Sequence, residues 1–247
     1  MSLYVYCLSD ESDAAAFEGL AGVGGASVRV LSLGRVAAVV SEFEDESVAV
    51  TGENVRAHNR VNSQLLAALT PLPFRFGTRA AASRLAEYVA SNEEALVASL
   101  ARVRGCVEMG VKIRDALEKA KGKRQKAKDE SEETAGEDAL GGSARGGSGT
   151  AFLLAKRREI LGDESARLRA EELAAWLASG VAGAARESAV RVNPSDAIVV
   201  RAAHLVERAR VEEYRERVRS LSEERRSLQF LKSGPWPPYS FSDIERR

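Results

Sequence analysis

The chain has 247 residues, of which 45% are hydrophobic and 29% charged, and this composition is typical of a folded protein with a sizeable core in one or two domains. Its 36 Lys and Arg residues balance 36 Asp and Glu residues, so the overall charge gives no electrostatic case for binding nucleic acid or an anionic membrane surface. No run of about 18 apolar residues occurs, and we therefore expect no transmembrane helix and no membrane partner.

The chain opens with patterns typical of strands and one short helix. Leu3–Leu8 alternates and is rich in Tyr and Val, which predicts a strand that enters the fold directly and is not typical of a signal peptide. We expect a short helix from Asp10 to Gly19, with Asp10 as its N-cap, and a Gly-rich turn after it. Two apolar runs, Val28–Leu33 and Val36–Val40, flank a Gly-Arg pair and predict a β-hairpin.

Two amphipathic helices and a strand complete the first half. The first helix opens at Val50–Glu53 and runs to about Leu69, where two prolines stop it. The second helix runs from Arg79 to about Arg104. Alternation over Cys106–Arg114 then predicts a strand, so this half has the order β-α-β-β-α-α-β.

The composition changes between residues 115 and 149. Basic residues cluster over Lys119–Lys128, acidic residues over Asp129–Asp138, and a Gly/Ser tract follows. The segment holds few large apolar residues, so the area it can bury does not offset the entropy lost on ordering. We expect a mobile, disordered insertion over residues 115–149, and the alternative is a charged arm that grips a partner.

The second half predicts the order α-β-β-α-β. Its elements are a long helix or a pair of helices from Thr150 to about Ala185 with Gly162 as the point of interruption, strands at Ala189–Val192 and Ala197–Val206, a charged helix at Val211–Ser227 and a strand at Leu228–Leu231. With the strand Cys106–Arg114 in front, the order becomes β-α-β-β-α-β, which is the split β-α-β pattern of ferredoxin-like folds.

We therefore expect an α+β protein of two domains. Residues 1–104 form an N-terminal α+β domain, and residues 105–233 form a ferredoxin-like C-terminal domain that carries the insertion. Residues 234–247 form a tail that holds half of the chain's six prolines. Because proline fixes φ and lacks an N–H donor, the tail is neither a helix nor a central strand. Its aromatic residues either fold onto this chain or dock on another one.

No catalytic constellation and no metal site stand out in the sequence. Cys7 and Cys106 lie in apolar runs without a second nearby ligand, so we expect two buried thiols, with a disulfide between neighbouring strands as the alternative. His58 and His204 are expected to have structural or surface roles. The chain has no nucleophile elbow, P-loop or dinucleotide motif, and we expect no enzymatic activity, no cofactor and no metal.

One loop, Pro71–Thr78, has a composition that favours a binding role. Arg75 lies between two phenylalanines and is held by prolines and Gly77. The planar guanidinium of Arg75 is suited to bind a carboxylate. The alternative is that Arg75 caps a helix or forms a pair within its own domain.

Segments along nearly the whole chain carry a resemblance to a known family. They are, in order, Tyr4-Val5-Tyr6, His58, Pro71–Thr78, Val107–Lys112, Gly149–Arg157 and Gly234–Phe241. Together they resemble the gas-vesicle accessory family GvpF/GvpL. The chain departs from the family at Cys7 and in the insertion, which leaves the role of the insertion open.

The resemblance implies a non-enzymatic, cytoplasmic protein that acts in the assembly of gas vesicles, the gas-filled protein shells that give microbial cells buoyancy. It implies partners among the small hydrophobic shell protein and other gas vesicle accessory proteins, and an α+β fold of two domains with a ferredoxin-like second domain. The residues that match the family signature and are candidates for partner binding are Phe74, Arg75, Phe76, Gly77, Thr78, Trp236, Pro237, Pro238, Tyr239 and Phe241.

Two other functions remain open at the level of the sequence. One is an enzyme that anchors a carboxylate substrate at Arg75, and the other is a ligand sensor with a ferredoxin-like regulatory domain. A concave pocket near Arg75 with a perturbed acid or base favours the enzyme, whereas the sensor predicts a ligand between paired domains of a dimer. A flat or filled surface there favours the assembly role.

Overall fold

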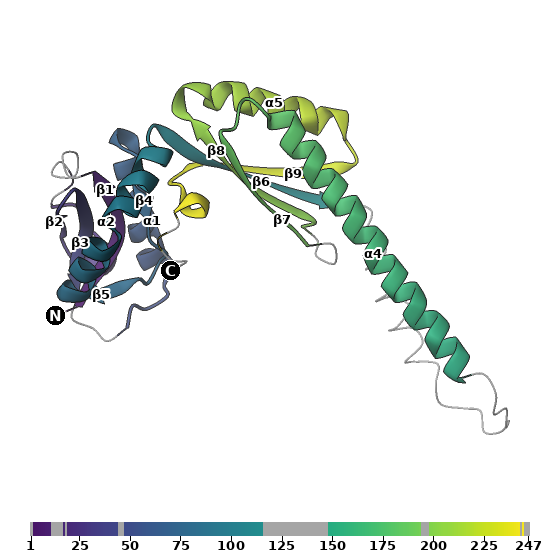
Figure 1. The fold of residues 1–247 in the computed structure, drawn as a ribbon, viewed down its shortest axis with the longest axis horizontal. Coiled ribbons are helices and arrows are strands. Elements are labelled where there is room, and N and C mark those ends of the chain that lie inside the picture. The colour runs from purple at the N-terminus through teal and green to yellow at the C-terminus, as the bar shows by residue number, and fades with distance from the viewer. Residues whose placement is uncertain are drawn as a thin grey trace.

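The computed structural model describes residues 2–10, 17, 19–43, 47–115, 148–193, 198–242 and 244, with the backbone alone for residues 115 and 148–163. The described residues form two α+β units, each built on an antiparallel sheet, and the C-terminal end of the chain returns to the first unit (Figure 1). The predicted insertion lies outside the described residues, except that Asp115 ends a strand and Ser148 and Gly149 begin a helix.

The first unit is built around strand β1. The strands are β1 (Ser2–Asp10), β2 (Val28–Leu33), β3 (Val36–Phe43), β4 (Leu72–Pro73) and β5 (Arg79–Ala81), in the order β2-β3-β1-β4, with β5 also paired to β1. The predicted first strand and hairpin are confirmed. The very short strands β4 and β5 were not predicted, because two or three residues are too few to show an alternating pattern.

Two helices cover the first sheet. Helix α1 (Gly52–Ala68) begins after Thr51, whose side chain accepts a hydrogen bond from the backbone N–H of Asn54 at 3.1 Å. Helix α2 (Ala82–Val103) begins three residues later than the sequence predicts, because Arg79–Ala81 pairs with β1 as strand β5. The 3-10 turn η2 (Val23–Gly25) contacts α1.

Strand β1 is buried on both faces, and a bulge sets the direction of its side chains. The register of β1 against β3 shifts between Val5 and Cys7. Tyr6 and Cys7 therefore both belong to the core on the α1 side, while Val5 and Leu8 belong to the core on the α2 side. A simple alternation, as the sequence suggested, does not predict this arrangement.

The short helix predicted from Asp10 to Gly19 lies mostly outside the described residues. Asp10 itself is the last residue of β1. Its carboxylate accepts a hydrogen bond from Nη2 of Arg104 at 2.7 Å. The end of β1 is thus tied to the residue that follows α2.

The second unit has the chain order β-α-β-β-α-β. Its elements are β6 (Cys106–Asp115), α4 (Ser148–Val181), β7 (Glu187–Val192), β8 (Val200–Glu207), the 3-10 turn η3 (Arg208–Arg210), α5 (Val211–Glu224) and β9 (Leu228–Trp236), and the sheet order is β7-β8-β6-β9. Helix α4 is continuous through Gly162, so of the two predicted alternatives the single long helix is observed and the pair of helices is not. Both helices lie on the same face of the sheet, and α4 projects beyond it (Figure 1).

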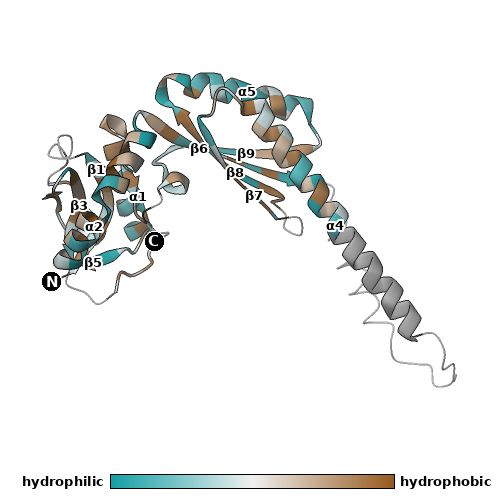
Figure 2. Cartoon of the chain, in the orientation of Figure 1, coloured by the Kyte–Doolittle hydropathy of each residue, from teal (hydrophilic) through white to brown (hydrophobic). Residues whose placement is uncertain are grey.

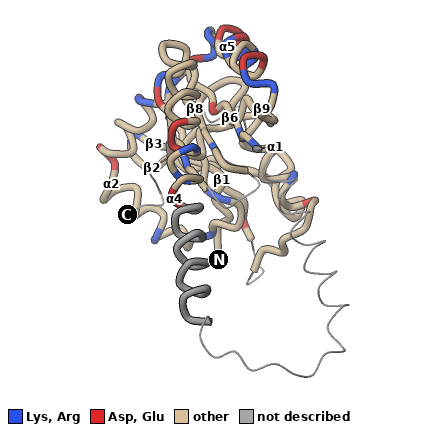
Figure 3. The backbone as a smooth tube through the Cα atoms, turned by 90° about the vertical axis from the view of Figure 1, so that its right-hand side faces the viewer, with Lys and Arg blue, Asp and Glu red and all other residues tan. Residues whose placement is uncertain are grey.

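The core of the second unit lies between this sheet and its two helices. Leu177 and Val181 of α4 and Tyr214 and Val218 of α5 pack on the inward side chains of the strands. In Figure 2 the strands are largely hydrophobic, whereas α5 is mostly hydrophilic, and Figure 3 shows charges of both signs gathered along α5. Burial of its apolar stripe, formed by Tyr214, Val218 and Leu221, therefore holds α5 in place.

Strand β9 and the tail differ from the prediction in their extent. The predicted strand Leu228–Leu231 continues to Trp236, so the first residues of the predicted tail belong to the sheet. Pro235 is tolerated there because β9 is an edge strand of the sheet. The chain then forms the 3-10 turn η4 (Tyr239–Phe241) against the first unit.

Arg208 joins the two units. Its Nη2 donates to the carbonyl oxygen of Leu69 at 2.7 Å and to Oγ1 of Thr70 at 3.3 Å, just past the end of α1. Thr70 Oγ1 also accepts from the backbone N–H of Gly105 at 3.1 Å. Carbonyl groups at the end of a helix lack partners within the helix, so Arg208 serves as a cap supplied by the second unit.

Candidate functional site

A groove of about 510 Å³ opens between the first unit and the face of the second sheet that carries no helix. Arg75 reaches it from the loop after β4, and Trp236 and Tyr239 reach it from the C-terminal segment. Glu108 of β6 also lines it. The fold thus brings together residues from the two segments that the sequence analysis singled out. We call this cavity the groove.

One wall of the groove is the C-terminal segment, which a buried polar cluster anchors. The hydroxyl of Tyr239 lies 3.2 Å from Nε2 of His58 and accepts a hydrogen bond from Nδ2 of Asn62 at 3.2 Å. The hydroxyl of Tyr4 lies 2.9 Å from Nδ1 of the same histidine. The predicted structural role of His58 is therefore observed.

The polar cluster is uncharged near neutral pH. Burial lowers the pKa of His58 to about 4 and raises the pKa of Tyr4 to about 12. Burial also raises the pKa of Tyr239. The cluster therefore holds the tail through neutral hydrogen bonds and ring packing, and Phe76 adds an edge contact to the His58 ring at 5.8 Å between ring centroids.

Glu108 fastens the tail to the second sheet. Its two carboxylate oxygens accept hydrogen bonds from the backbone N–H and the hydroxyl of Ser240, at 2.7 and 2.9 Å. Burial raises the pKa of Glu108, and the bonds from Ser240 act in the opposite direction. Since both oxygens already accept hydrogen bonds from the tail, the carboxylate has a structural role in this arrangement.

The floor of the groove is made of small residues beside a row of cations. Gly110 and Ala189 both pair in register with Ala203 of β8, the strand between them. Two residues further along each strand, Lys112 and Arg191 both pair with Arg201. Paired residues of neighbouring strands lie on the same face, so the three cations form one row, which we call the basic row.

The predicted site residues are distributed between the core and the groove. Several are buried or partly buried in the first unit and hold the loop and tail in place, namely Phe74, Phe76, Pro237, Pro238, Tyr239 and Phe241. Gly77 has a φ of 89°, and its N–H donates to the Tyr4 hydroxyl at 3.1 Å. Thr78 donates through Oγ1 to the carbonyl oxygen of Arg75 at 2.8 Å. Arg75 and Trp236, which is 46% exposed, reach the surface.

Sequence reasoning missed the basic row and the contact between Glu108 and Ser240. The sequence signal for the row was weak: cations at alternate positions of strands, such as Lys112 on β6, also occur on solvated sheet faces. Only the register of the three strands brings the cations together. The contact of Ser240 with Glu108 spans 132 positions, so no local pattern indicates it.

The described residues offer little redox or metal chemistry. No group of three or more His, Cys, Asp or Glu side chains placed to hold a metal ion occurs among them. Cys7 and Cys106 are buried free thiols, so the disulfide alternative is not observed in this part of the chain. His204 is buried on β8, where its Nδ1 lies 2.6 Å from the hydroxyl of Tyr214.

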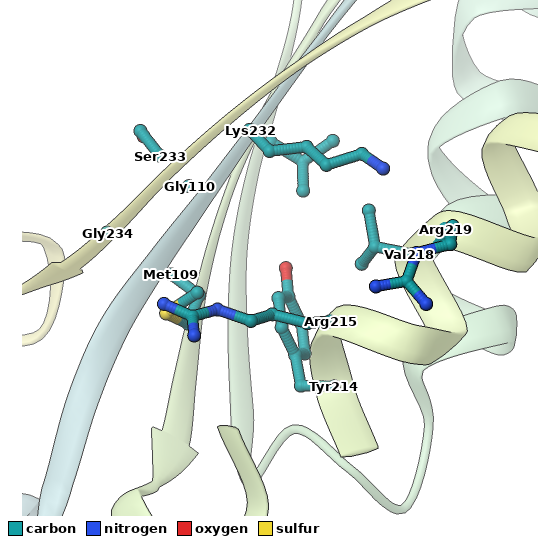
Figure 4. Close-up of a pocket in the computed structure, with 10 residues that line it drawn as sticks. Met109, Gly110, Tyr214, Arg215, Val218, Arg219, Lys232, Ser233 and Gly234 are labelled. Atoms are coloured by element: carbon teal, nitrogen blue, oxygen red, sulfur yellow. The ribbon is translucent and has the colours of Figure 1, made fainter. Parts of the chain in front are cut away.

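A smaller pocket of about 250 Å³ lies on the helix side of the second sheet, between β6, β9 and α5 (Figure 4). Arg215, Arg219 and Lys232 line it, and the hydroxyl of Tyr214 points into the same space. Arg215 and Arg219 form ion pairs with glutamates of their own helix, and Lys232 donates to Ser222 at 3.4 Å. The cations of this pocket thus already have partners on α5.

Comparisons with known proteins find similarity along nearly the whole chain. A family model described as "Gas vesicle synthesis protein GvpL/GvpF" matches residues 2–243. The curated "Gas vesicle protein L" of Streptomyces sp. (strain CB03234) is 30% identical over 268 residues, which cover 98% of this chain and 92% of that protein.

Two solved structures share the fold. The crystal structure of the gas vesicle protein GvpF from Anabaena sp. PCC7120 superposes with a TM-score of 0.70 at 18% identity, covering 98% of this chain and 95% of that one. GvpF from Microcystis aeruginosa gives a TM-score of 0.68 at 17% identity, with 98% of each chain covered. Across the described residues, none of the helices has the length and apolar character needed to cross a membrane. The chain belongs to the GvpL/GvpF family of gas vesicle synthesis proteins.

Proposed function

We propose that this chain is an accessory protein of gas vesicle assembly that binds the hydrophobic shell protein and other accessory proteins, either as a chaperone or nucleation factor or as a minor component of the vesicle. The observation that carries the proposal is the family match over residues 2–243. A shell subunit with an apolar gas-facing surface exposes that surface before assembly, and such surfaces aggregate. A protein that covers the apolar surface of the subunit until the subunit joins the shell prevents this aggregation.

We propose the rim of the groove as the contact surface. Trp236 is a large aromatic residue on the end of an edge strand, and 46% of it is exposed. The residues that follow Trp236 in the chain are held in place by the contact of Tyr239 with His58 and by the hydrogen bonds from Ser240 to Glu108. A rigid, exposed indole loses little conformational entropy on binding and is typical of interface hot spots. Phe74 and Phe241 are buried and support this surface from below.

We further propose that the two units correspond to domains over residues 1–104 and 105–233, and that the second is ferredoxin-like. The sheet order β7-β8-β6-β9, its antiparallel pairing and the chain order β-α-β-β-α-β support this assignment. The tail, residues 234–247, then connects the domains, since it leaves the second sheet through β9 and packs on the first unit.

We propose a cytoplasmic location in association with gas vesicles and a mode of action without catalysis. The groove near Arg75, lined by the high-pKa carboxyl of Glu108, is the observation that favours an enzyme or a ligand sensor instead. Both oxygens of that carboxylate accept hydrogen bonds from Ser240, so a general acid or base at this position would have to release the tail. The protein-contact role requires no such opening.

Complementation in a gas-vesicle-forming host tests the proposal. The host lacks its own GvpL/GvpF proteins and receives this chain, the Trp236→Ala variant or an empty vector, and vesicles are counted by electron microscopy. We expect vesicles with the chain, few with Trp236→Ala and none with the vector. Equal numbers of vesicles with the chain and with the empty vector contradict the assembly role. Equal numbers with both protein variants contradict the contact surface alone.

A further inference from the structure

The groove has a strong excess of positive charge, although the chain as a whole has none. The charged residues that line it are the cations Arg75, Lys112, Arg191 and Arg201 and a single carboxylate, Glu108. The complete chain carries 36 basic and 36 acidic residues. The excess is therefore a local property of this surface. The four cations outnumber this one carboxylate even when Glu108 is ionised, and both of its oxygens are hydrogen-bonded to Ser240.

The basic row brings three cations to neighbouring positions of one sheet face. Lys112 and Arg191 are both exposed, and each lies directly opposite Arg201. Like charges at directly opposed positions of neighbouring strands repel each other. Two further carboxylates, Glu187 and Glu207, lie on this face beyond the small-residue floor, and Glu187 forms an ion pair with Arg102 of α2 at 3.5 Å. An anionic partner over the row is attracted by the cations of all three strands.

The floor of the groove admits a peptide backbone. The residues next to the basic row are Gly110, Ala203 and Ala189, whose side chains rise little above the sheet. The row crosses three strands, which lie about 4.8 Å apart, so its ends are about 10 Å apart. An extended chain advances about 3.3 Å per residue. Side chains that face the same way are two positions, about 6.6 Å, apart, so acidic residues at alternate positions lie over neighbouring cations of the row.

We propose that the groove binds an extended acidic segment of a protein partner, with its carboxylates on the basic row and an apolar side chain against Trp236. The assignment of that partner to gas vesicle assembly rests on the proposed function, whereas the chemistry of recognition does not. The cations select a segment of opposite charge, the small-residue floor selects an extended backbone, and the exposed indole selects an apolar neighbour. Arg75, on the opposite wall, gives a further contact for a carboxylate.

A peptide titration on the full chain tests the proposal. The chain has two tryptophans, so Trp176→Phe leaves Trp236 as the only indole and makes its fluorescence report on the groove. The probe is a synthetic peptide of alternating Glu and Phe, compared with peptides that carry Gln or Lys in place of Glu. We expect the Glu peptide alone to shift the emission of Trp236, with an affinity that falls as salt is raised.

Charge reversal locates the binding. Lys112→Glu with Arg191→Glu reverses two exposed charges of the row and is expected to weaken binding of the Glu peptide about tenfold or more, which corresponds to about 1.4 kcal/mol. The matched control reverses two exposed arginines that do not line the groove, Arg60→Glu with Arg226→Glu, and changes the net charge equally. Circular dichroism confirms that both double variants fold.

Each outcome of the peptide titration either supports or overturns the proposed binding of an acidic segment. Loss of binding in the groove variant alone supports the proposal. Equal affinity in both double variants, equal binding of the Gln peptide, or no binding of the Glu peptide overturns it. Equally tight binding of a single-stranded oligonucleotide assigns the groove to polyanions in general and also overturns it. Because the titration contains neither the shell protein nor another accessory protein, its failure leaves the assembly role standing, and failed complementation leaves the peptide result standing.

Discussion

The hydroxyl of Tyr239 lies 3.2 Å from Nε2 of His58, although 181 positions separate the two residues. Through this contact the end of the chain becomes part of the first unit. The same segment leaves Trp236 exposed at the edge of the second sheet. One side of the tail is therefore structural, and the other side is exposed at the surface that we propose as the contact for a partner.

Tyr239→Phe is expected to destabilise the protein. The substitution removes the hydroxyl that meets His58 and Asn62 and leaves their buried polar atoms with one partner fewer. Such a loss costs about 1 to 2 kcal/mol in the free energy of unfolding, which urea denaturation measures. Trp236→Phe is the control, because this side chain is half exposed, and its cost should be smaller. Equal stability of the two variants would show that the Tyr239 contact contributes nothing.

Stability is expected to fall with acid below the pKa of an unfolded histidine. Burial lowers the pKa of His58 and of His204 to about 4 each in the folded state, against about 6.5 when unfolded. The folded state thus favours the neutral rings, so their contribution is complete above about pH 6.5 and is lost as the pH falls toward 4. The lowered pKa of each histidine corresponds to at most about 3 kcal/mol of unfolding free energy, which is lost once the pH has fallen below about 4.

His204→Gln tests this pH dependence. The variant removes one of the two titrating rings, so its unfolding free energy should decline less steeply between pH 6.5 and 4 than that of the parent chain. Urea denaturation at several pH values measures the difference. Glu108, whose raised pKa acts with the opposite sign, is common to both proteins and cancels in the comparison. Parallel curves would mean that burial of His204 does not hold its ring neutral.

Arg208→Ala is expected to loosen the junction between the units. It removes the donors to Leu69 and Thr70 at the end of α1, and hydrogen bonds from charged groups to such carbonyls are worth about 2 kcal/mol. Arg208→Lys keeps the charge but not the planar fork of the guanidinium, so its stability should lie between those of the parent chain and Arg208→Ala. The control is Arg210→Ala, whose partner Glu213 is a surface residue of α5, with an expected cost below about 1 kcal/mol. Calorimetry measures all three, and a larger loss at Arg210 than at Arg208 would refute the cap.

Gly180→Ala is expected to disturb the packing of α4 on α5. A Cβ atom at Gly180 meets Cδ2 of Leu221 at 2.5 Å, and Leu221 is itself buried. Overpacking of this kind costs about 1 to 3 kcal/mol, which exceeds the gain of up to about 1 kcal/mol in helix propensity. Ser179→Ala at the neighbouring exposed position is the control. A stabilised Gly180→Ala protein would show that Leu221 moves aside freely.

The regular elements were predictable because their signals are local. The alternation of Cys106–Arg114 and the apolar stripe of α1 survive in the structure as β6 and a half-buried helix. Strand β5 and the extension of β9 were not predictable, because pairing with a distant strand decides both. The bulge that turns Tyr6 and Cys7 to one side is likewise set by β3.

The candidate site was predictable only in its parts. The composition of Pro71–Thr78 and of the tail marked Arg75 and Trp236, and the structure places both at one groove. The basic row depends on the register of β6, β7 and β8, which no local pattern contains. Similarly, nothing near Glu108 in the sequence indicates that Ser240 would occupy its carboxylate.

Co-expression with the small hydrophobic shell protein tests most directly whether this chain keeps that protein ready for assembly. Sedimentation measures the soluble fraction of the shell protein, and purification through this chain measures how much is bound. We predict that the shell protein stays soluble and co-purifies with the chain, and that Trp236→Ala lowers both values. Shell protein that pellets equally with and without the folded chain, and that does not co-purify, would contradict the account.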